Sequence, residues 1–394
     1  MTTSKPTNYT KIHSSLQDLK SACEAQGFKG WDPYDGLNSW IIQKTFLGKS
    51  RIFRLAWIQL FKRNPINLRT IFGIKKEYNP KGLGLFLIGY CNLYSKTPQS
   101  HYLNKIEFLS SKLLELQSTG FSGACWGYNF DWQARAFYQP KFTPTVVATS
   151  FVVEALLKSY EITKNDKLLE TAMSSSKFIL RDLNKTYDSN ENYTLSYSPL
   201  DSTQVYNAGL LGAKALALIF KYTAERKLIN EAKKIVDYVC SKQNIDGSWH
   251  YSSLRYHQWI DNFHTGYNIE CIYIYQSISG DNTYQKNISI GLNFYLTQFF
   301  SQEGISKYYN DKTYPIDIHS PAQLLVTLAK INKLNPNLEL VEKVISWTIN
   351  NMQSKKGYFY YQKRQFFSSK IPYIRWAQAW MFYSLSYYYL QIDE

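Results

Sequence analysis

The chain has 394 residues, of which 44% are hydrophobic, 16% aromatic and only 19% charged. A chain of this length can bury a large core, and no long Gly-, Ser- or Pro-rich stretch divides it, which favours one domain over residues 1–394. The 45 Lys and Arg residues exceed the 30 Asp and Glu residues, and the net charge of +15 favours an anionic partner without choosing between nucleic acid, acidic lipid and acidic glycan.

Cysteine usage and the N-terminus bear on the cellular compartment. The five cysteines are odd in number and show no Cys-x-x-Cys pairing, which is typical of reduced thiols rather than of a disulfide framework or a zinc site. The first residues lack the apolar core of a signal peptide, and the best apolar run, 83–93, is too short to cross a bilayer. We therefore expect a soluble cytoplasmic protein.

The sequence contains no recognisable motif for a cofactor, a metal or a nucleic acid. No His, Cys and Asp residues have the spacing of metal ligands, and Gly82 and Gly84 are not followed by the Gly-Lys-Ser/Thr of a phosphate loop. No RNA-binding signature accompanies the positive charge. We expect no metal, no cofactor and no nucleic-acid partner.

A sequence repeat indicates the architecture. Three predicted helices end at Gln117, Gln243 and Gln353, and each glutamine precedes a glycine- and aromatic-rich junction: GACWGY, DGSWHY or KKGYFYY. The intervals are 126 and 110 residues, with weaker junctions near Asp182 and Gln302 between them. The unit is therefore roughly 55–63 residues, which is longer than the ~34–47 residues of common helical-pair repeats.

Hydrophobic periodicity predicts twelve helices. In chain order they lie at about 11–26, 83–98, 101–118, 143–162, 165–184, 203–223, 227–243, 263–279, 283–300, 318–334, 338–353 and 372–391. From the fourth onward, even-numbered helices are apolar on nearly all sides and should be buried, whereas odd-numbered helices are amphipathic and should form an outer layer. This alternation predicts an all-α fold, an (α/α)6 toroid or six-hairpin barrel, with the first helix packed beside the last.

Loop lengths distinguish the two rims of this ring. Connections that leave even-numbered helices are short, whereas those that enter them are long, at about 119–142, 185–202, 244–262, 301–317 and 354–371. In an up-and-down ring all the long loops open on one rim, and long ordered loops are usually functional. The segment 28–82, with the sequence GWDPYDGLNS and a basic run, is predicted to be an insertion on this long-loop rim.

The entry loops and the first turns of the inner helices are rich in polar and aromatic residues. Such groups suit sugars, because the C–H faces of sugar rings stack on aromatic rings while hydroxyls and carboxylates take the polar groups. The residues expected to bind substrate are Arg135, Asn207, Trp132, His319, Gln323, Arg375, Trp376 and Asp35. The candidates for catalysis are His264, Tyr267, Asp131, Asp201 and Asp261.

Two kinds of chemistry would use these residues differently. Hydrolysis needs two carboxylates that flank the glycosidic bond, for which Asp131 pairs with Asp201 or Asp261. Elimination or epimerisation at a uronate needs a His or Tyr to remove the C5 proton, and an amide or guanidinium to neutralise the carboxylate. The residues that fit these roles are His264, Tyr267, Asn207 and Arg375.

Each candidate also has a purely structural explanation. Asp201 and Asp261 precede helix starts and would serve there as N-caps. His264 and His319 lie near the starts of inner helices, where a neutral, hydrogen-bonded core histidine is common. Asp35 would do no more than form a turn.

Several segments resemble known families. QNIDGSW, at 243–249, is similar to the Gln…Gly-x-Trp junction of squalene-cyclase-type toroids. DPYDGLNS, RNPINLR, NPKGLGLFL, CWGYNFDWQARAF, PTVVATSFV and DNFHTGYNIE together resemble a family of bacterial capsule and exopolysaccharide biosynthesis proteins. Some members are mislabelled delta-aminolevulinic acid dehydratase, which is a (β/α)8 barrel with a Schiff-base lysine, whereas this sequence lacks alternating strands. The resemblance implies a role in making or modifying a surface polysaccharide and assigns no residue roles.

We therefore expect a carbohydrate-active enzyme of surface polysaccharide biosynthesis or modification that acts on an acidic glycan. Glycoside hydrolase and uronate lyase are slightly favoured over a C5- or 2-epimerase. The first alternative is a non-catalytic glycan-binding or scaffold protein of a polysaccharide assembly complex, with membrane-associated assembly proteins as partners. The second is a terpenoid cyclase-like enzyme, which the absence of an acidic Asp-x-Asp-Asp or Asp-Asp-x-x-Asp cluster weakens.

Overall fold

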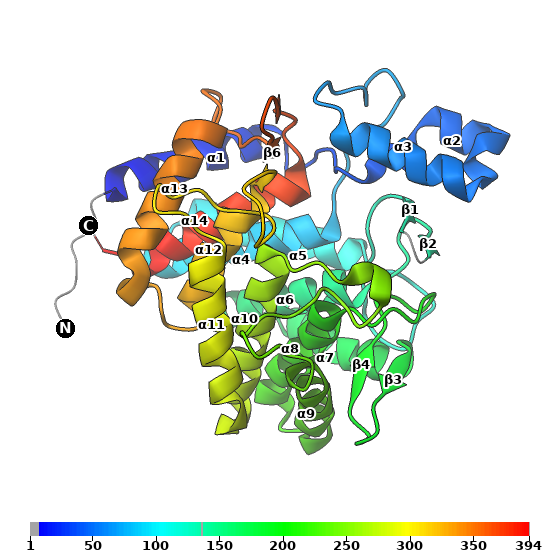
Figure 1. Cartoon of the computed structure of the whole chain (residues 1–394), viewed down its shortest axis with the longest axis vertical. Helices are drawn as coiled ribbons and strands as arrows, with labels where there is room; N and C mark the ends of the chain where they lie inside the picture. Colours follow the sequence, from blue (N-terminus) through cyan, green and yellow to red (C-terminus); the bar gives the residue numbers. More distant parts are fainter. Residues whose placement is uncertain (1–7, 135–136, 394) are drawn as a thin grey trace.

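The computed structural model describes residues 8–134 and 137–393, within which twelve helices form a ring of two layers (Figure 1). The inner helices are α4 (Pro80–Lys96), α6 (Val146–Thr163), α8 (Tyr206–Thr223), α10 (Asn262–Ser279), α12 (His319–Lys330) and α14 (Trp380–Gln391). The outer helices are α1 (Tyr9–Ala25), α5 (Ser100–Glu115), α7 (Asp166–Arg181), α9 (Arg226–Cys240), α11 (Gln285–Gln298) and α13 (Leu338–Met352). The predicted all-α toroid is confirmed, with helix ends that differ by a few residues from the predicted ones.

Contacts between helices close the ring. The inner helices pack in chain order, from α4 through α6, α8, α10 and α12 to α14, and α14 packs back against α4. Outer helices α5, α7, α9, α11 and α13 each pack on the inner helix that precedes them, and α1 packs on α14. The N-terminal helix thus completes the sixth pair, as predicted. Within the described ranges, no helix combines the length and the apolar character needed to span a membrane.

The short connections follow from the way the inner helices end. Lys164, Ala224 and Gly280 follow α6, α8 and α10 in the left-handed conformation, with φ of 55°, 54° and 74°. A left-handed residue at this position ends an α-helix and turns the chain away from its axis. Each outer helix therefore begins almost at once and runs back along its inner partner.

Two of the three glutamine junctions tie neighbouring hairpins together, whereas Gln117 donates to the carbonyl of Leu114, just before it in the chain. Gln243 Nε2 donates a hydrogen bond to the backbone carbonyl of Asn287, in α11, at 3.0 Å. Gln353 Nε2 donates to the backbone carbonyl of Ser15, in α1, at 3.2 Å. Trp249 is buried and donates its Nε1–H to a carbonyl near the end of α9 at 3.1 Å. One junction thus joins α9 to α11, and another joins α13 to α1 where the ring closes.

The strands in the described part of the chain are confined to the long loops. β1 (Trp132–Gln133) with β2 (Tyr138–Gln139), and β3 (Lys185–Tyr187) with β4 (Tyr193–Leu195), form antiparallel hairpins. β5 (Ile316–Asp317), β6 (Gln362–Lys363) and β7 (Ser368–Ser369) form an antiparallel sheet. This sheet joins the loop that enters α12 to the loop that precedes α14, so two inner-helix starts are fixed to each other.

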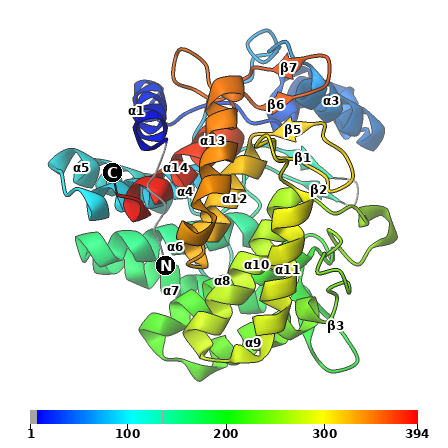
Figure 2. The ribbon, with the colours of Figure 1, turned by 60° about the vertical axis from the view of Figure 1, so that its left-hand side comes forward.

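The segment between α1 and α4 contains helices that the periodicity does not predict. It holds α2 (Trp40–Lys44), α3 (Arg51–Arg63) and the 3-10 turns η1 (Asp35–Asn38) and η2 (Phe46–Lys49). In both views α3 lies to one side of the ring (Figures 1 and 2). Its sequence, RIFRLAWIQLFKR, has apolar residues on every side, so no single stripe marks the helical period.

The junction after α9 offers a test of how tightly the hairpins are locked. Gly247 has φ of +93°, and a Cβ placed there would lie 2.3 Å from the carbonyl oxygen of Ile290 in α11. Gly280 has a φ of +74° and no atom within 4 Å of that position. We expect Gly247→Ala to lower the free energy of unfolding by about 3 kcal/mol, because strain and backbone clash add, and Gly280→Ala by about 1 kcal/mol. Chemical denaturation measures both losses, and equal losses would show that the junction does not fix α11.

Candidate functional site

The starts of the inner helices bring one cluster of side chains together at the long-loop rim. We call the following six residues the central cluster: Lys81, His264, Tyr267, His319, Trp376 and Trp380. They come from the first two turns of α4, α10 and α12, from the segment just before α14 and from the first residue of α14. The ring centroids of His319 and Trp380 are 4.1 Å apart, those of His319 and Trp376 5.2 Å, and those of Tyr267 and His319 5.8 Å. Four residues predicted from the sequence, the two histidines with Tyr267 and Trp376, therefore meet here.

His264 is held in place by Asp261, the residue before α10. Asp261 Oδ1 accepts a hydrogen bond from the backbone N–H of His264 at 3.0 Å, and Oδ2 lies 2.7 Å from His264 Nδ1. Because a carboxylate only accepts, Nδ1 carries a proton, and in the neutral imidazole Nε2 is therefore the nitrogen with the free lone pair. The His264 side chain is 21% exposed. Asp261 is thus both the N-cap that the sequence suggested and the residue that orients His264.

Tyr267 and His319 form a hydrogen-bonded pair next to His264. The Tyr267 hydroxyl and His319 Nε2 are 2.8 Å apart, and both side chains are buried. Burial raises the pKa of Tyr267 well above its ordinary value. Burial, and then the positive charges nearby, hold the pKa of His319 well below its ordinary value. Both groups are neutral near pH 7, so Tyr267 is a hydrogen-bond donor or an acid there and not a ready base.

A buried carboxylate positions the rings around this pair. Asp317 Oδ1 accepts hydrogen bonds from Trp376 Nε1 at 2.8 Å and from the backbone N–H of His319 at 3.0 Å, and Oδ2 accepts from Gln362 Nε2 at 3.0 Å. Burial raises the pKa of Asp317 to about 6. Trp376 itself lies in η6 (Ile374–Ala379), a π-helical turn of the kind that is frequent at functional sites.

Lys81 is a buried cation surrounded by aromatic rings. The residue is 4% exposed, and its Nζ lies 4.4 Å from the ring centroid of Phe151, 5.2 Å from that of Trp380 and 5.6 Å from that of Tyr267. No carboxylate within the described residues pairs with it. Burial, and then the cations around it, hold the pKa of Lys81 well below its ordinary value. An ammonium in this position is stabilised by any anion that binds beside it.

Arg375, by contrast, is neutralised within the protein. Its Nε and Nη2 donate to Asp32 Oδ2 at 2.6 Å and to Asp32 Oδ1 at 2.8 Å, and both residues are buried. The guanidinium also packs 4.9 Å from the ring centroid of Tyr128. The anionic partner that Arg375 was expected to find in a substrate is therefore supplied by the segment between α1 and α4, in a bidentate pair.

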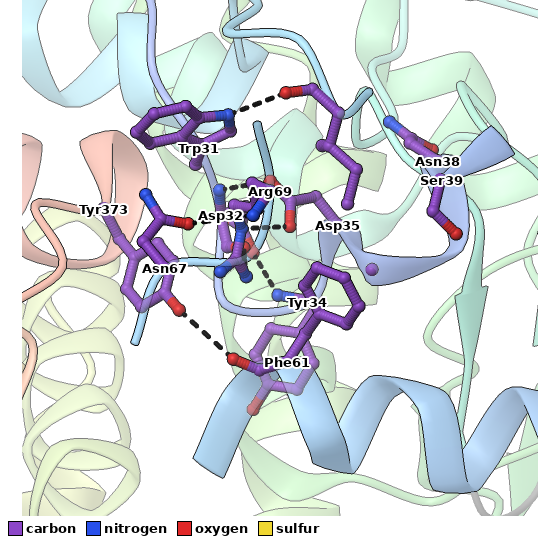
Figure 3. Close-up of polar contacts among 12 residues, drawn as sticks. Trp31, Asp32, Tyr34, Asp35, Asn38, Ser39, Phe61, Asn67, Arg69 and Tyr373 are labelled. Carbon is purple, nitrogen blue, oxygen red and sulfur yellow. Dashed lines mark hydrogen bonds and ion pairs between the residues drawn. The ribbon is translucent and has the colours of Figure 1, made fainter. Parts of the chain in front are cut away.

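A second buried ion pair holds the segment that carries Asp32. Arg69 Nε donates to Asp35 Oδ1 at 2.7 Å, and Arg69 Nη2 donates to the backbone carbonyl of Asp32 at 2.7 Å (Figure 3). Asp35 Oδ2 also accepts from the backbone N–H of Asp32 at 2.9 Å. Asp35 was expected to bind substrate, but its oxygens are used inside the segment, because a buried carboxylate requires partners.

Half-buried aromatic rings lie between this segment and the central cluster. Tyr34 packs 5.6 Å from Trp376 and 6.0 Å from Trp132, measured between ring centroids. Trp132 in turn lies 5.6 Å from Tyr197. Partly exposed rings in this arrangement can stack against the C–H faces of a sugar. Trp132 thus lies on the rim beside the central cluster.

Two predicted catalytic carboxylates are occupied by loop hydrogen bonds. Asp201 accepts from the backbone N–H groups of Ser198 at 2.7 Å and Thr203 at 2.9 Å, within its own loop. Asp131 accepts from Gln43 Nε2 at 3.0 Å, which attaches the β1–β2 loop to the inserted segment. We therefore leave both residues outside the site.

Three other predicted residues have separate positions. Gln323 donates its Nε2–H to Glu270 Oε2 at 3.2 Å, deeper in the ring than the central cluster. Asn207 is buried in the first turn of α8, and its Oδ1 has no hydrogen-bond partner in the described part of the chain. Arg135 lies outside the described residues.

A network of buried charges joins four inner helices about two turns beyond the rim. Lys214 donates to Glu154 at 2.8 Å and to Glu270 at 3.0 Å, while Lys330 donates to Glu270 at 2.9 Å and also to Glu154. Against the effect of burial, the two glutamates raise the pKa of Lys214 to about 12. Two cations and two anions balance, so this network needs no ligand.

Neither Lys81 nor Asp317 is among the residues predicted from the sequence. The signal for Lys81 is a single charge in the apolar run PKGLGLFLIGYC at a helix start. Asp317 stands two residues before His319, in the segment YPIDIHSPAQ, where the histidine is the more evident candidate.

The ion pair between Asp32 and Arg375 should be the main attachment of the inserted segment. Asp32→Ala leaves a buried guanidinium without a partner, and we expect it to lower the free energy of unfolding by about 3–5 kcal/mol. Replacing both partners, Asp32→Leu with Arg375→Met, should recover most of this loss. Glu339→Ala, which removes an exposed ion pair with Lys343, is the control and should cost less than about 1 kcal/mol. Denaturant unfolding of the wild type and the three variants measures these free energies. Similar losses of unfolding free energy for Asp32→Ala and Glu339→Ala would contradict this account.

Comparisons with known proteins agree with the fold. No protein-family profile matches the sequence, and no curated protein sequence matches it. The solved structures that resemble it include a cellobiose 2-epimerase from Bacillus thermoamylovorans, which is 14% identical with a TM-score of 0.61 over 80% of this chain and 90% of that one. A sugar epimerase from a ruminal bacterium is 12% identical, with a TM-score of 0.62 over 82% of this chain and 91% of that one.

A third similar structure comes from a hydrolase. The GH76 α-mannanase BT2949 of Bacteroides thetaiotaomicron is 12% identical, with a TM-score of 0.60 over 79% of this chain and 86% of that one. At such identities the likeness concerns the fold. The chain therefore shares its (α/α)6 toroid with these carbohydrate-active enzymes.

Proposed function

We propose that the protein is a carbohydrate-active enzyme that transfers a proton at a sugar carbon next to a carboxylate or carbonyl group, as an epimerase or a lyase does. One observation carries this proposal: Asp261 Oδ2 holds His264 Nδ1 at a distance of 2.7 Å, which leaves Nε2 as the ring nitrogen that can accept a proton. The centroids of the His264 and Tyr267 rings are 5.9 Å apart, which lets both side chains face one sugar.

The reaction uses the two side chains as base and acid. His264 Nε2 takes the proton from the carbon, and the electron pair moves toward the neighbouring carbonyl or carboxylate oxygen. Tyr267 is protonated at the start of the reaction. It either donates a hydrogen bond to that oxygen or gives its proton to the carbon on the face opposite His264. In an epimerase the proton returns to the same carbon with inverted configuration, whereas in a lyase a leaving group departs from the next carbon.

Hydrolysis is less well supported than proton transfer. It requires two carboxylates that act on one glycosidic bond. Asp131 and Asp201 are held by loops, and Asp261 is bonded to His264. The similar structures include epimerases and also hydrolases, so the likeness in fold does not choose between the two chemistries. A D-mannose isomerase is among them, 12% identical with a TM-score of 0.60 over 79% of this chain and 86% of that one.

The substrate that we propose is an acidic glycan of a capsule or other exopolysaccharide. Lys81 supports the acidic group, since no carboxylate of the described residues forms an ion pair with it, and the aromatic rim supports the sugar ring. The resemblance of the sequence segments to capsule and exopolysaccharide biosynthesis proteins supports the pathway, with membrane-associated assembly proteins as partners. The five cysteines are free, which supports a reducing, cytoplasmic location.

Solvent exchange tests the proton transfer directly. When the protein is incubated with uronate-containing oligosaccharides in D2O, an epimerase places deuterium on the inverted carbon, a lyase yields an unsaturated sugar, and a hydrolase yields neither. We expect one of the first two outcomes, measured by NMR and mass spectrometry, and a roughly 10²–10⁴-fold lower rate for His264→Ala.

The control for this experiment is a histidine outside the site. His101, on α5, is exposed and paired with Glu24, so His101→Ala should leave the exchange rate unchanged. The melting temperature of both variants should match that of the wild type. Wild-type turnover by His264→Ala would rule out the proposed role of His264. So would cleavage of glycosidic bonds by the wild type that gives neither deuterium incorporation nor an unsaturated sugar.

Lys81 predicts a pH dependence of binding. Its pKa is lowered in the empty site, and a bound carboxylate raises that pKa, so binding takes up a proton between the two values. The affinity for an acidic oligosaccharide should therefore fall as the pH rises through this window, while the affinity for a neutral analogue should not. Lys81→Met should abolish the difference. Titration calorimetry in two buffers of different ionisation enthalpy measures the proton uptake, and the absence of uptake would exclude Lys81 as the carboxylate partner.

A further inference from the structure

The inserted segment has an unusual charge composition. Residues 36–76 contain nine Lys and Arg residues and no Asp or Glu. Some of them bind side chains on the inner side of the segment: Arg69 binds Asp35, Arg54 binds Gln133 at 2.8–2.9 Å, and Lys62 binds the hydroxyl of Tyr34 at 2.7 Å. The exposed ones are Lys44, Lys49, Arg51, Arg63, Lys75 and Lys76.

The same segment exposes large apolar side chains. In the described part of the chain, six of its residues leave 44–80% of their surface to solvent: Trp40, Phe46, Ile52, Leu60, Ile66 and Ile71. We call these six, with the exposed basic residues, the insertion surface. Single exposed apolar residues are common on proteins, but six within about thirty residues make this segment a candidate interaction surface.

Packing inside the segment separates an inner from an outer face. Ile58 and Phe61 of α3 are buried, with 2% and 1% exposure, and Ile58 packs with Leu37 and Ile42 in a small core of its own. Ile52 and Leu60, on the same helix, remain exposed. The outer apolar residues are therefore not needed to fold the segment, since the inner face already provides a core.

We propose that the insertion surface docks on an anionic lipid bilayer. An interfacial helix binds a membrane by placing apolar side chains at the boundary of headgroups and acyl chains while Lys and Arg contact acidic headgroups. The exposed Phe46, Ile52, Ile66 and Ile71 suit an acyl boundary, whereas an acidic polymer in water gains little from isoleucine side chains. The absence of acidic residues from 36 to 76 removes any repulsion from a negatively charged surface.

The segment that carries the insertion surface contacts the central cluster directly. Asp32, at the start of the inserted segment, forms the bidentate pair with Arg375, and Tyr34 packs 5.6 Å from Trp376. Figure 1 shows α2 and α3 beside the ring and away from α9 and α11. A bilayer bound to the insertion surface would therefore hold the long-loop rim close to the membrane.

Vesicle co-sedimentation of the full chain tests the proposal. Vesicles of pure phosphatidylcholine and vesicles with phosphatidylglycerol are compared at low and high salt, and we expect binding to the second kind that weakens with salt. The pair Lys44→Gln with Lys49→Gln should reduce the partition coefficient about 25-fold, at about fivefold for each lysine. The pair Phe46→Ser with Ile52→Ser should reduce it at least about tenfold, because the apolar contribution is lost.

A double variant outside the segment controls for nonspecific binding to vesicles. Lys242→Gln with Ile245→Ser removes one exposed lysine and one fully exposed isoleucine from the loop after α9 and should bind vesicles like the wild type. All variants should keep the wild-type melting temperature, since the replaced side chains are exposed. No binding to the anionic vesicles would overturn the proposal. Two further results would also overturn the proposal, because both indicate a site for a polyanion instead of a bilayer. One is unchanged vesicle binding by Phe46→Ser with Ile52→Ser, and the other is binding to soluble heparin without binding to vesicles.

Discussion

The inner helices are enclosed by the ring on every side, so each charge that they carry must find a partner within the protein or in a ligand. An unpaired buried charge costs several kcal/mol, and the structure avoids it in two places. Two turns beyond the rim, Lys214 and Lys330 are shared between Glu154 and Glu270. At the rim, Arg375 is paired with Asp32, which reaches it from outside the ring.

Lys81 is the exception to this rule, and it lies at the rim, next to the proposed catalytic residues. It lies among aromatic rings next to Tyr267, without an anionic partner in the described residues. The neighbouring Asp261 has two roles. One carboxylate oxygen caps α10, and the other accepts a hydrogen bond from His264. Because the N-cap is fixed by the first turn of a buried helix, the orientation of the imidazole is fixed as well.

The inserted segment is attached to this rim through its inner face and leaves its outer face in solvent. Two buried arginine–aspartate pairs bind it together and to the ring, while its outer face keeps apolar and basic residues in solvent. The arrangement separates a packed inner face from an outer face that is exposed to solvent. It also explains why Asp35 and Arg375 are not available to a substrate, although both residue types suit sugar recognition.

The sequence by itself determined the ring, because buried and amphipathic helices differ in where their apolar residues recur, and this difference does not depend on distant contacts. It also distinguished the rim that carries the long loops, since loop lengths are read along the chain, and it placed His264 and Tyr267 three residues apart on one helix. Only the tertiary structure decided which carboxylates are occupied: Asp131, Asp201 and Asp35 look alike in the sequence and differ in the donors that the fold places around them. The same holds for Lys81, because the absence of a partner is a property of neighbours that come from other helices, up to about 300 residues away along the chain.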